Sequence, residues 1–297
     1  MRRRAFLALS GGLLGILGGV AAAAPPPARR QRRAVAALAA LERHSGGRLG
    51  LFARDLAGGG CLAWRADERF PLCSTVKLLI VAALLQRVDQ GRERLAQIQP
   101  YTAADLLSYA PITRAHLATA PHGGMTLADL AAAALQWSDN TAANLLLRRL
   151  GGPAAVTAFS RGLGENVTRL DRWEPDLNSA LPGDRRDTSS PRAMADDLET
   201  LLLGPVLSTA SRRRLLDWMA GDHVGDHRLR AGLPGGWSMA DKTGSGENGT
   251  ANTVGLMMPP GRAPIVAAVY LTQSTLTAAD RDGVHREAAA LIAGLFT

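Results

Sequence analysis

The chain has 297 residues, of which 46% are hydrophobic and 20% are charged, and its formal net charge is +8. This composition is typical of a folded globular protein and excludes a disordered one. Basic residues are dispersed among acidic ones and aromatic residues are few, 5 Phe, 3 Tyr and 5 Trp, so nucleic acid is not an expected partner.

Residues 1–24 have the three parts of an export signal peptide: a basic start, an apolar middle over residues 5–20 and a small-residue end. The apolar part is too short and glycine-rich for a membrane span. Arg3 and Arg4, followed by Ala-Phe-Leu, resemble a twin-arginine signal, which exports an already folded protein; an ordinary arginine-rich secretory leader is the alternative. Removing Arg2, Arg3 and Arg4 lowers the charge of +8 by three, to +5. We expect an exported monomer, periplasmic or secreted, with no stable membrane association after cleavage.

The first elements of the mature chain are a helix and a hairpin. Residues 25–34 hold three prolines and a run of arginines and are interpreted as a linker. Residues 35–44 carry apolar residues at helical spacing and end before a Ser-Gly-Gly stop, which predicts a helix. The strand-like segments 49–55 and 61–67 flank a glycine-rich turn over residues 57–60, which predicts a β-hairpin.

An apolar run over residues 78–85 follows Ser74-Thr75-Val76-Lys77 and predicts a helix buried nearly all round. A hydroxyl and an ammonium three residues apart at the start of a helix face the same side, so Ser74 and Lys77 are predicted to form a paired site. A lysine buried without a partner is costly or has a shifted pKa. The rest of the sequence is therefore expected to supply partners for Lys77.

From residue 101 to about residue 220 the pattern is one of helices and irregular loops. Helices are predicted over residues 127–135, 141–150, 153–163, 191–203 and 211–221. Residues 172–187 differ, because they contain two prolines, a glycine and alternating acids and bases with little periodicity. An ordered surface loop of this length is usually retained for function.

Strand patterns return over residues 238–242, 250–258 and 265–272, and a final helix is predicted over residues 278–296. This order indicates an α/β fold of the α+β type: an antiparallel sheet of about five strands, built from both chain ends and flanked by helices, with an inserted all-helical domain. The α/β domain is assigned to residues 35–70 and 221–297. The all-α domain, including the active-site loop 172–187, is assigned to residues 71–220.

Three short motifs carry the chemistry, and each is weak alone. They are Ser74 with Lys77, then Ser138-Asp139-Asn140 directly before a predicted helix, and Lys242-Thr243-Gly244 at the end of a predicted strand. Ser, Asp and Asn are also preferred helix caps, so capping alone is an alternative for the second motif. Together, in this order and at these separations, the motifs resemble those of penicillin-recognising serine acyltransferases, the β-lactamases and penicillin-binding proteins.

A fourth element narrows the resemblance to the class A β-lactamases. Glu174 and Asn178 place a carboxylate and an amide four residues apart, as needed to hold one water between them. Arg172 and Asp187 match the ion pair that closes this loop in the family; the alternative is that each is a solvated surface charge. The resemblance covers residues 49–296, nearly the whole mature chain.

The resemblance implies a catalytic role for each matching residue. Ser74 would attack the amide carbonyl, and the base in acylation would be Lys77, or Glu174 acting through water. In deacylation Glu174 would be the base, with Asn178 orienting the water. Ser138 would carry a proton to the departing ring nitrogen.

The resemblance also implies how the substrate is bound. The backbone N–H groups of Ser74 and Ser245 would bind the oxyanion. Asn140 would hold the side-chain amide of the substrate. Lys242, Thr243 and Ser245, with Gly244 between them, would receive its carboxylate.

Two further residues match the family less directly. The family often supplies an arginine to the substrate carboxylate from the strand after the Lys-Thr-Gly motif, but that position is Ala251 here. Arg228 matches an alternative source of this cation, and a plain surface arginine is the other interpretation. Tyr109 matches the aromatic residue at the pocket mouth, with a core tyrosine as the alternative.

We expect neither a metal nor another cofactor. His223 and His227 have the spacing of helical metal ligands, but Gly225 between them weakens a helix and the serine chemistry needs no metal. Cys61 and Cys73 are the two cysteines. They could pair in an exported protein, although a chain folded before export would meet the oxidising compartment late, and Cys73 is more simply a packing residue.

The function predicted from the resemblance is hydrolysis of the β-lactam amide of penicillins and cephalosporins, which would confer β-lactam resistance. The alternatives are a D-alanyl-D-alanine peptidase of the penicillin-binding kind and a β-lactam sensor that stays acylated. Glu174 and Asn178 argue against both. In some family members Cys73 is matched by a cysteine bridged to a second one, a feature associated with carbapenem hydrolysis. The partner position is Gly246 here, so this bridge cannot form and the substrate spectrum stays open.

Overall fold

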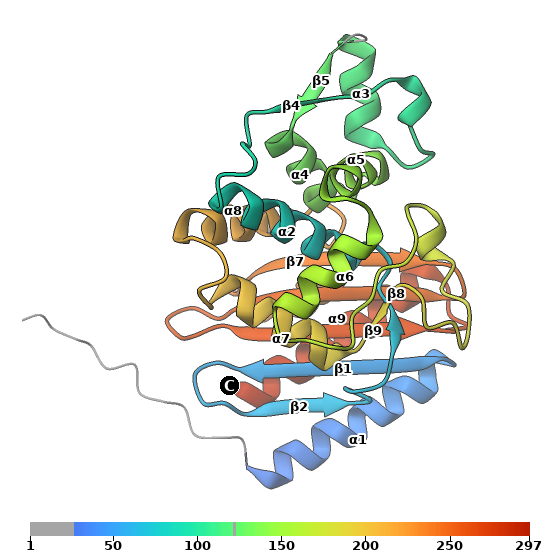
Figure 1. The fold of residues 1–297 in the computed structure, drawn as a ribbon. Helices are drawn as coiled ribbons and strands as arrows, with labels where there is room; N and C mark the ends of the chain where they lie inside the picture. Colours follow the sequence, from blue (N-terminus) through green and yellow to red (C-terminus); the bar gives the residue numbers. More distant parts are fainter. Residues whose placement is uncertain (1–26, 121–122) are drawn as a thin grey trace, which may run out of the picture.

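The computed structural model describes residues 27–120 and 123–297, so the leader predicted at residues 1–24 lies outside the described residues. Figure 1 shows a sheet with helices on both faces, in which the blue N-terminal strands lie beside the red C-terminal ones. All neighbouring strands are antiparallel, in the order β2-β1-β9-β8-β7, which confirms the predicted sheet. The strands are β1 Arg48–Asp55, β2 Cys61–Trp64, β7 Ser238–Gly246, β8 Thr250–Met258 and β9 Ile265–Thr272.

Strand β9 is the centre of the sheet. All 8 of its residues are buried, as expected for a strand with neighbours on both edges and helices over both faces. It pairs with β1 from Arg48 opposite Thr272 to Asp55 opposite Ile265. The two ends of the chain therefore share one hydrogen-bonded ladder.

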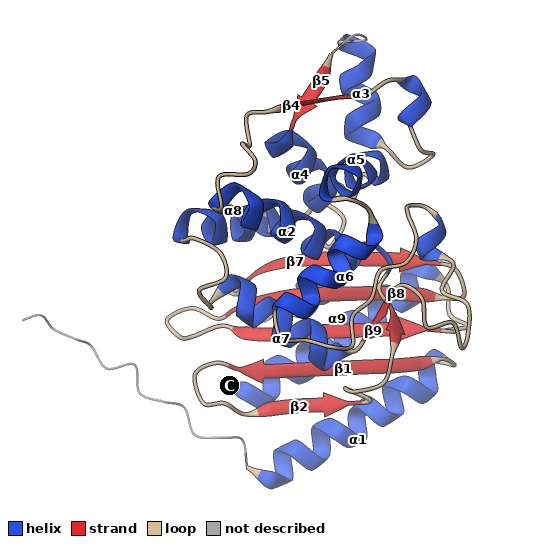
Figure 2. Cartoon of the chain, viewed as in Figure 1, coloured by secondary structure: helices blue, strands red, loops and turns tan. Residues whose placement is uncertain are grey.

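One face of the sheet packs on the terminal helices α1 (Ala28–Ser45) and α9 (Ala278–Phe296). Figure 2 shows α9 in blue behind the red strands. Leu38 of α1, Ile292 of α9 and Val269 of β9 belong to one apolar cluster. Each helix thus buries a single apolar stripe and leaves its other side to solvent.

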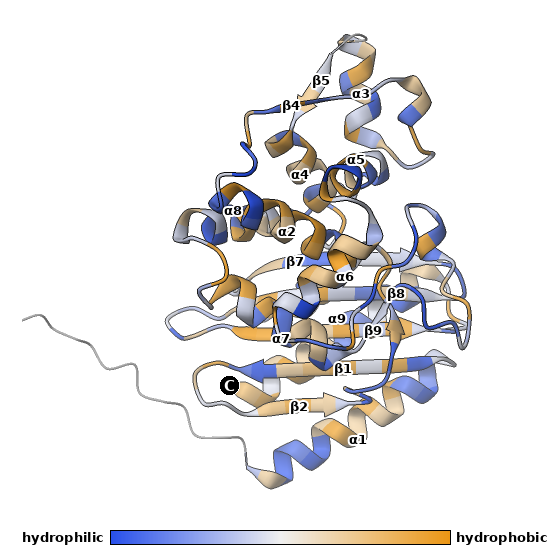
Figure 3. Cartoon of the chain, viewed as in Figure 1, coloured by the Kyte–Doolittle hydropathy of each residue, from blue (hydrophilic) through white to orange (hydrophobic). Residues whose placement is uncertain are grey.

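The opposite face of the sheet packs on the helical part of the chain. Phe52 and Tyr270 of the sheet share a second apolar cluster with helix α2 (Lys77–Asp89). Residues 77–85 of α2 are all buried, and Figure 3 colours much of this helix orange for its hydropathy. The other helices of this part are α3 Pro111–Thr119, α4 Leu127–Gln136, α5 Asn140–Leu150, α6 Pro153–Gly162, α7 Pro191–Leu202 and α8 Thr209–Ala220. No helix within residues 27–120 or 123–297 combines the length and apolar character of a membrane span.

The linker predicted at residues 25–34 is wrong from residue 28 onward, because residues 28–34 form the beginning of α1. Alanine and arginine have high helix propensity. Pro27 takes the extended conformation of a helix-capping residue, with φ −56° and ψ 138°. The side chain of Ala34 is buried in the α1 and α9 cluster, so the arginines lie on the solvated side of a packed helix.

The segment predicted as all-helical also contains short strands. Strand β3 (Phe70–Pro71) pairs with β6 (Thr188–Ser189), and β4 (Ile98–Pro100) pairs with β5 (Gly124–Thr126). Strands of two or three residues are too short to show a period-two pattern, so the sequence does not indicate them.

Two predicted strand ends also differ from the structure. Strand β2 stops at Trp64 because Arg65 has φ +44°, outside the extended region. Strand β7 continues beyond residue 242 to Gly246, where it is still paired with Thr250 of β8. Pairing with a neighbour, which no local pattern reports, decides where β7 ends.

Asp197 of helix α7 is a buried acid without a counter-charge in contact. It is 1% exposed, and neither carboxylate oxygen has a hydrogen-bond donor among the described residues. Burial, together with the nearby carboxylates of Glu165 and Asp196, raises its pKa to about 8. A raised pKa in the folded state means that its contribution to stability is fully present below the unfolded value of 3.8 and is lost as the pH rises through about 8.

We therefore expect Asp197→Asn to raise the melting temperature, because the amide keeps the shape of the acid and cannot ionise. The gain over the wild type should grow between about pH 4 and pH 8, to on the order of 5 °C. Thermal denaturation across this pH range checks it. Asp217→Asn is the control, since Asp217 is an exposed acid on helix α8; a gain in that variant, or none in Asp197→Asn, contradicts the prediction.

Candidate active site

Ser74 and Lys77 come from a turn that leads directly into the buried helix α2. Residues Cys73–Val76 form a 3-10 helix, and Lys77 is the first residue of α2. Cys73 begins this turn with φ +46°, a left-handed conformation that is strained for a residue other than glycine. Ser74 is 8% exposed and Lys77 is fully buried. The turn thus places the hydroxyl at the surface of a cavity and the ammonium inside the protein.

The ammonium of Lys77 has acceptors from three other residues. Its Nζ donates hydrogen bonds to Ser138 O and Asn140 Oδ1, both at 2.6 Å, and to Ser138 Oγ at 3.3 Å. It forms an ion pair with Glu174 Oε1 at 3.1 Å that lacks the alignment of a hydrogen bond. Burial lowers the pKa of Lys77, and the Glu174 carboxylate opposes this shift. Within the described residues, no hydrogen bond joins Lys77 Nζ to Ser74 Oγ. The two residues lie on one turn, but their side chains are not directly hydrogen-bonded.

In the Ser138-Asp139-Asn140 segment, the middle residue caps a helix and the two outer residues contact Lys77. Asp139 accepts a hydrogen bond from the Ala142 N–H at 2.8 Å and so caps α5. It also accepts one from the Thr113 N–H at 2.9 Å, which ties α5 to α3. Ser138 has φ +56°, so its backbone turns sharply enough for the residues on both sides of Asp139 to contact Lys77. The capping alternative is correct for the middle residue only.

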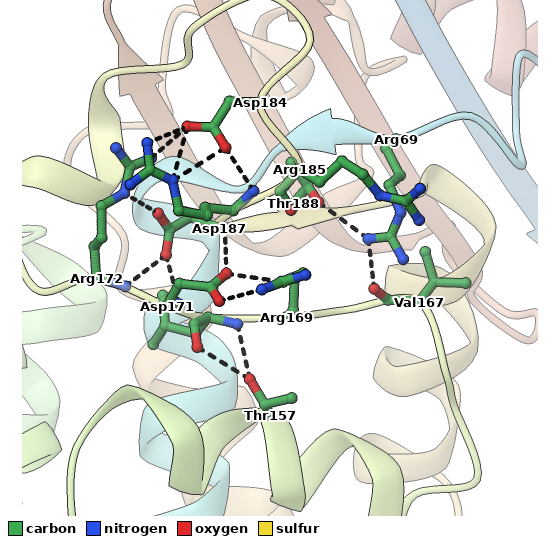
Figure 4. Close-up of polar contacts among 12 residues, drawn as sticks. Arg69, Thr157, Val167, Arg169, Asp171, Arg172, Asp184, Arg185, Asp187 and Thr188 are labelled. Carbon is green, nitrogen blue, oxygen red and sulfur yellow. Dashed lines mark hydrogen bonds and ion pairs between the residues drawn. The ribbon is translucent and has the colours of Figure 1, made fainter.

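The loop 172–187 is closed at its base by the predicted ion pair, which is confirmed. Arg172 Nε donates to Asp187 Oδ2 at 2.5 Å, and the backbone N–H groups of Asp171 and Arg172 donate to Asp187 Oδ1 at 2.7 and 2.9 Å. Figure 4 shows Arg172 directed toward both Asp184 and Asp187. The Asp187 side chain is 1% exposed, so these are not solvated surface charges. The base of the loop is a fixed frame for Glu174.

Glu174 is held by contacts to its side chain and its backbone. Asn178 Nδ2 donates to Glu174 Oε2 at 2.5 Å. Asn144 of helix α5 accepts from the Glu174 N–H at 3.0 Å and donates to the Glu174 carbonyl at 2.9 Å. The sequence analysis missed Asn144, although it lies four residues after Asn140 and therefore on the same face of α5. Glu174 is 3% exposed, and its Oε1 has no donor among the described residues.

The third motif lies on strand β7, at the edge of the sheet next to the turn that bears Ser74. Lys242 is fully buried; burial lowers its pKa to about 8, and the carboxylate of Asp222 opposes that shift. Its Nζ donates to the carbonyl of Thr243 at 3.0 Å. A Cβ added at Gly244 would lie 3.2 Å from Ser74 N and 3.0 Å from the carbonyl oxygen of Leu72. Glycine here lets the two backbones approach closely.

These elements surround a cavity of about 350 Å³. It is lined by Ser74, Tyr109, Ser138, Asn140, Asn178, Val224, Arg228, Thr243, Gly244 and Ser245. Tyr109 is 47% exposed and so is not a core tyrosine. The sequence analysis missed Val224, which carries no polar or periodic signal. Lys77, Glu174 and Lys242 are buried next to this lining.

Arg228 is anchored at the cavity and is not a plain surface arginine. Its Nε donates to Asp282 Oδ1 of helix α9 at 2.8 Å, and its Nη2 donates to Ser245 Oγ at 2.7 Å. Its Nη1 donates to the carbonyls of Gly244 and Asn252 at 2.8 and 2.9 Å. The guanidinium therefore adds positive charge beside the end of β7, the side on which Lys242 and Thr243 lie.

The described residues contain no group of three or more His, Cys, Asp or Glu residues placed to hold a metal ion. The ring of His223 stacks on Trp137 with centroids 4.3 Å apart. Cys61 and Cys73 are both free thiols, and burial raises the pKa of the Cys73 thiol. Cys73 acts as a packing residue in this structure.

Comparison with known proteins places this site in a family. The model of the beta-lactamase enzyme family matches residues 32–295. Beta-lactamase CTX-M-8 of Citrobacter amalonaticus is 47% identical over 255 residues, covering 86% of this chain and 86% of that protein. The carbapenem-hydrolyzing beta-lactamase KPC of Klebsiella oxytoca is 48% identical over 251 residues, covering 84% of this chain and 83% of that protein.

Solved structures agree with the sequence comparison. The structure of an ancestral class A beta-lactamase superposes with a TM-score of 0.86 at 55% identity and covers 89% of this chain and 100% of that chain. The putative class A beta-lactamase PenP from Rhodopseudomonas palustris superposes with a TM-score of 0.85 at 48% identity, covering 88% and 99%. The likeness thus extends through both the sheet and the helical part.

Gly246, at the end of β7, is a contact point between the strand and the loop. A Cβ added there would lie 2.6 Å from both Cys73 Sγ and the carbonyl oxygen of Asn178. The same carbonyl accepts a hydrogen bond from the Glu247 N–H at 2.9 Å. A side chain at position 246 must therefore displace the segment that holds Asn178 against Glu174.

We expect Gly246→Ala to lower the free energy of unfolding by about 1–3 kcal/mol through this overpacking. Gly235→Ala is the matched control, because a Cβ at Gly235 would meet nothing within 4 Å and its φ is not left-handed. Urea denaturation of the two variants beside the wild type measures the effect. Equal stability of the two glycine variants would show that the contact with the loop is not tight.

Proposed function

The chain belongs to the class A β-lactamase family, and we propose that it hydrolyses the lactam amide bond of penicillins and cephalosporins, so that it confers β-lactam resistance. One observation carries this proposal: Glu174 forms an ion pair with the buried Lys77 and accepts a hydrogen bond from Asn178, which lines the same cavity as Ser74. A carboxylate in this position can direct water onto an ester of Ser74, which is the step that separates hydrolysis from permanent acylation.

In the acylation step, Ser74 Oγ forms a bond to the lactam carbonyl carbon and loses its proton to a base. The lowered pKa of Lys77 favours its neutral amine, which could accept that proton, and Glu174 could accept it through water. The carbon–nitrogen bond of the ring then breaks. Ser138, whose Oγ lies 3.3 Å from Lys77 Nζ, supplies a proton to the departing nitrogen and takes one in turn from Lys77 Nζ.

Two backbone N–H groups are proposed to stabilise the oxyanion of the tetrahedral intermediate, those of Ser74 and Ser245. The close approach of β7 to the turn at Ser74, which Gly244 permits, supports this assignment. Such donors are fixed before the reaction begins, so they stabilise developing charge without reorganisation.

Substrate recognition is proposed to rest on the polar lining of the cavity. The substrate carboxylate lies against Lys242, Thr243, Ser245 and Arg228, a group with two cations and two hydroxyl donors. Asn140 is proposed to hold the side-chain amide of the substrate: its Oδ1 is occupied by Lys77 Nζ, which leaves the amide N–H groups as donors to a substrate carbonyl.

In deacylation, Glu174 takes a proton from water as the water oxygen attacks the ester carbonyl. The bond between that carbon and Ser74 Oγ then breaks, and the proton held by Glu174 is returned to Ser74 Oγ. Glu174 Oε1 has no hydrogen-bond donor among the described residues, so it can accept from a water. Asn178 holds the other oxygen, Oε2, and therefore fixes the direction in which Oε1 points. Neither a D-alanyl-D-alanine peptidase nor a sensor that stays acylated needs this arrangement.

We expect Glu174→Gln to be acylated on Ser74 and to deacylate about 10³-fold more slowly than the wild type, because the amide cannot take the proton. Mass spectrometry of the intact protein after mixing with penicillin, together with burst kinetics, measures both steps. Asp176→Asn is the matched control, since Asp176 is exposed in the same loop. Near wild-type turnover of Glu174→Gln contradicts the deacylation route, and a long-lived adduct on the wild type contradicts hydrolysis itself.

The site is proposed to lie at the junction of two parts of the chain, the α/β part at residues 35–70 and 221–297 and the helical part at residues 71–220. Ser74 and Glu174 come from the second part and Lys242 from the first. One apolar cluster spans both parts, which supports a junction that is rigid.

We further propose that the protein is an exported monomer that reaches the periplasm, or is secreted, by the twin-arginine route. The support is the sequence of the leader, in which Arg3 and Arg4 precede an apolar segment. Once the leader is cleaved, the exported protein is proposed to have no stable membrane association.

We expect the double substitution Arg3→Lys with Arg4→Lys to retain the protein as an uncleaved precursor in the cytoplasm, because the twin-arginine route requires both guanidinium groups. Cell fractionation with immunodetection measures the distribution. Arg2→Lys, a neighbouring change that leaves the pair intact, is the control and should export normally. Export of the double variant at the wild-type level would indicate an ordinary secretory leader.

A further inference from the structure

Two buried acids lie against the edge strand β7, outside the set of residues that the proposed reaction uses. Asp241 directly precedes Lys242 on β7 and therefore points to the opposite face of the sheet. Asp222 lies in the segment after helix α8 that covers this edge of the sheet. Asp222 is 3% exposed and Asp241 is fully buried. Neither position was singled out by the sequence analysis.

Each acid has one oxygen with a partner and one without. The Val224 N–H donates to Asp222 Oδ1 at 2.9 Å, and Arg230 Nε donates to Asp241 Oδ1 at 2.6 Å. Within residues 27–120 and 123–297, no donor reaches Oδ2 of either acid. Burying two such oxygens unpaired is unfavourable.

The two unpaired oxygens meet beside Gly225. A Cβ added at Gly225 would lie 2.6 Å from Asp241 Oδ2 and 2.9 Å from Asp222 Oδ2. Both oxygens are thus close to one point, which only a residue without a side chain leaves free. Two buried carboxylates directed at one point repel each other when both are ionised, and a proton carried by one and donated to the other would satisfy both oxygens.

We propose that Asp222 and Asp241 hold one proton between them at mildly acidic pH, and that the negative charge left when this proton is released keeps the ammonium of Lys242 protonated. The two acids are positioning residues, because they act on the substrate carboxylate only through Lys242. This inference rests on the proposed function where it concerns substrate binding, and on the geometry alone where it concerns the shared proton.

The charges around the pair agree with this assignment. Burial raises the pKa of Asp241 to about 6 and also raises that of Asp222, while burial lowers the pKa of Lys242 to about 8. The strongest influence opposing the shift of Lys242 is the carboxylate of Asp222. The charged groups that face Lys242 are Asp222, Lys77, Asp241 and Arg228, and those that face the two acids are Lys242, Arg230 and Arg228.

The charge of the Asp222 and Asp241 pair changes with pH. As the pH rises through about 6 the pair loses its proton and gains a negative charge, because the pKa of Asp241 is raised to that value. Lys242 would otherwise begin to lose its proton, and the nearby negative charge delays that loss to higher pH. Uptake of a substrate carboxylate is thereby maintained across neutral pH.

Infrared spectroscopy of the protein tests the shared proton without reference to activity. In an Asp197→Asn background, which removes the other buried acid with a pKa near 8, we expect a carboxylic-acid carbonyl band that disappears as the pH rises through about 6. In Asp222→Asn the band should disappear at a lower pH than in the parent, because Asp241 stays buried but no longer has a second carboxylate that favours its protonation. It should persist in Asp226→Asn. Asp226 is a matched control because it also lies near Arg230, at 3.9 Å, but its side chain is 67% exposed.

The pH dependence of KM tests the positioning role. For a penicillin, we expect the rise of KM at alkaline pH to begin about one pH unit lower in Asp222→Asn than in the wild type, because Lys242 loses the negative charge that most strongly favours its protonation. The kcat should not follow this shift, and Asp226→Asn should have the wild-type profile. Asp241→Asn provides a second variant if Asp222→Asn does not fold.

Each outcome decides a separate point. Absence of a titrating acid band in the wild type would show that both carboxylates are ionised and would overturn the shared proton. Superimposable KM profiles for Asp222→Asn and the wild type would overturn the positioning role. A wild-type protein that hydrolyses no β-lactam would refute the proposed function. The infrared experiment would still test the shared proton, because it does not depend on activity.

Discussion

The buried ammonium of Lys77 is the constraint on which the rest of the structure depends. A cation enclosed by the apolar helix α2 has an unfavourable free energy unless acceptors replace its lost hydration. Ser138, Asn140 and Glu174 supply those acceptors from two segments that are far from Lys77 in the sequence. The contacts that satisfy this charge therefore also bring together the side chains of the candidate site.

The partners of Lys77 are in turn held by residues that never enter the cavity. Asn144 binds the backbone of Glu174, and Asp187 closes the base of the loop through Arg172. Asp139 caps α5 while its neighbours contact the ammonium. A buried polar network in which nearly every group is paired is rigid, and rigidity is what a directed water and a fixed oxyanion site require. Among the described residues, buried oxygens without a donor remain at Glu174 Oε1 and Asn178 Oδ1 in this network, and at Oδ2 of Asp222 and of Asp241 next to β7.

The edge strand β7 brings the two parts of the chain together. Gly244 allows its backbone to approach Ser74, and Gly246 allows the loop to rest against it at Asn178. Lys242 arrives at the cavity because β7 is paired with β8 in one register, from Ser238 opposite Met258 to Gly246 opposite Thr250. A register shift by one residue would turn Lys242 to the other face of the sheet. The position of this cation is therefore a property of the whole sheet.

The sequence by itself determined the α+β class, the bounds of β8, β9 and α9, and the spacing that pairs Glu174 with Asn178, because periodicity and local spacing are legible along the chain. It did not indicate that residues 28–34 continue a helix, where β7 ends, or that Asn144 and Val224 belong to the site. Nor did it show that Lys77 contacts Asn140 and Ser138 in preference to Ser74. The contacts of Lys77 with Asn140 and of Asn144 with Glu174 join segments tens of residues apart, which leave no local pattern. Only the tertiary structure decided them, because packing places such residues together without regard to their distance in sequence.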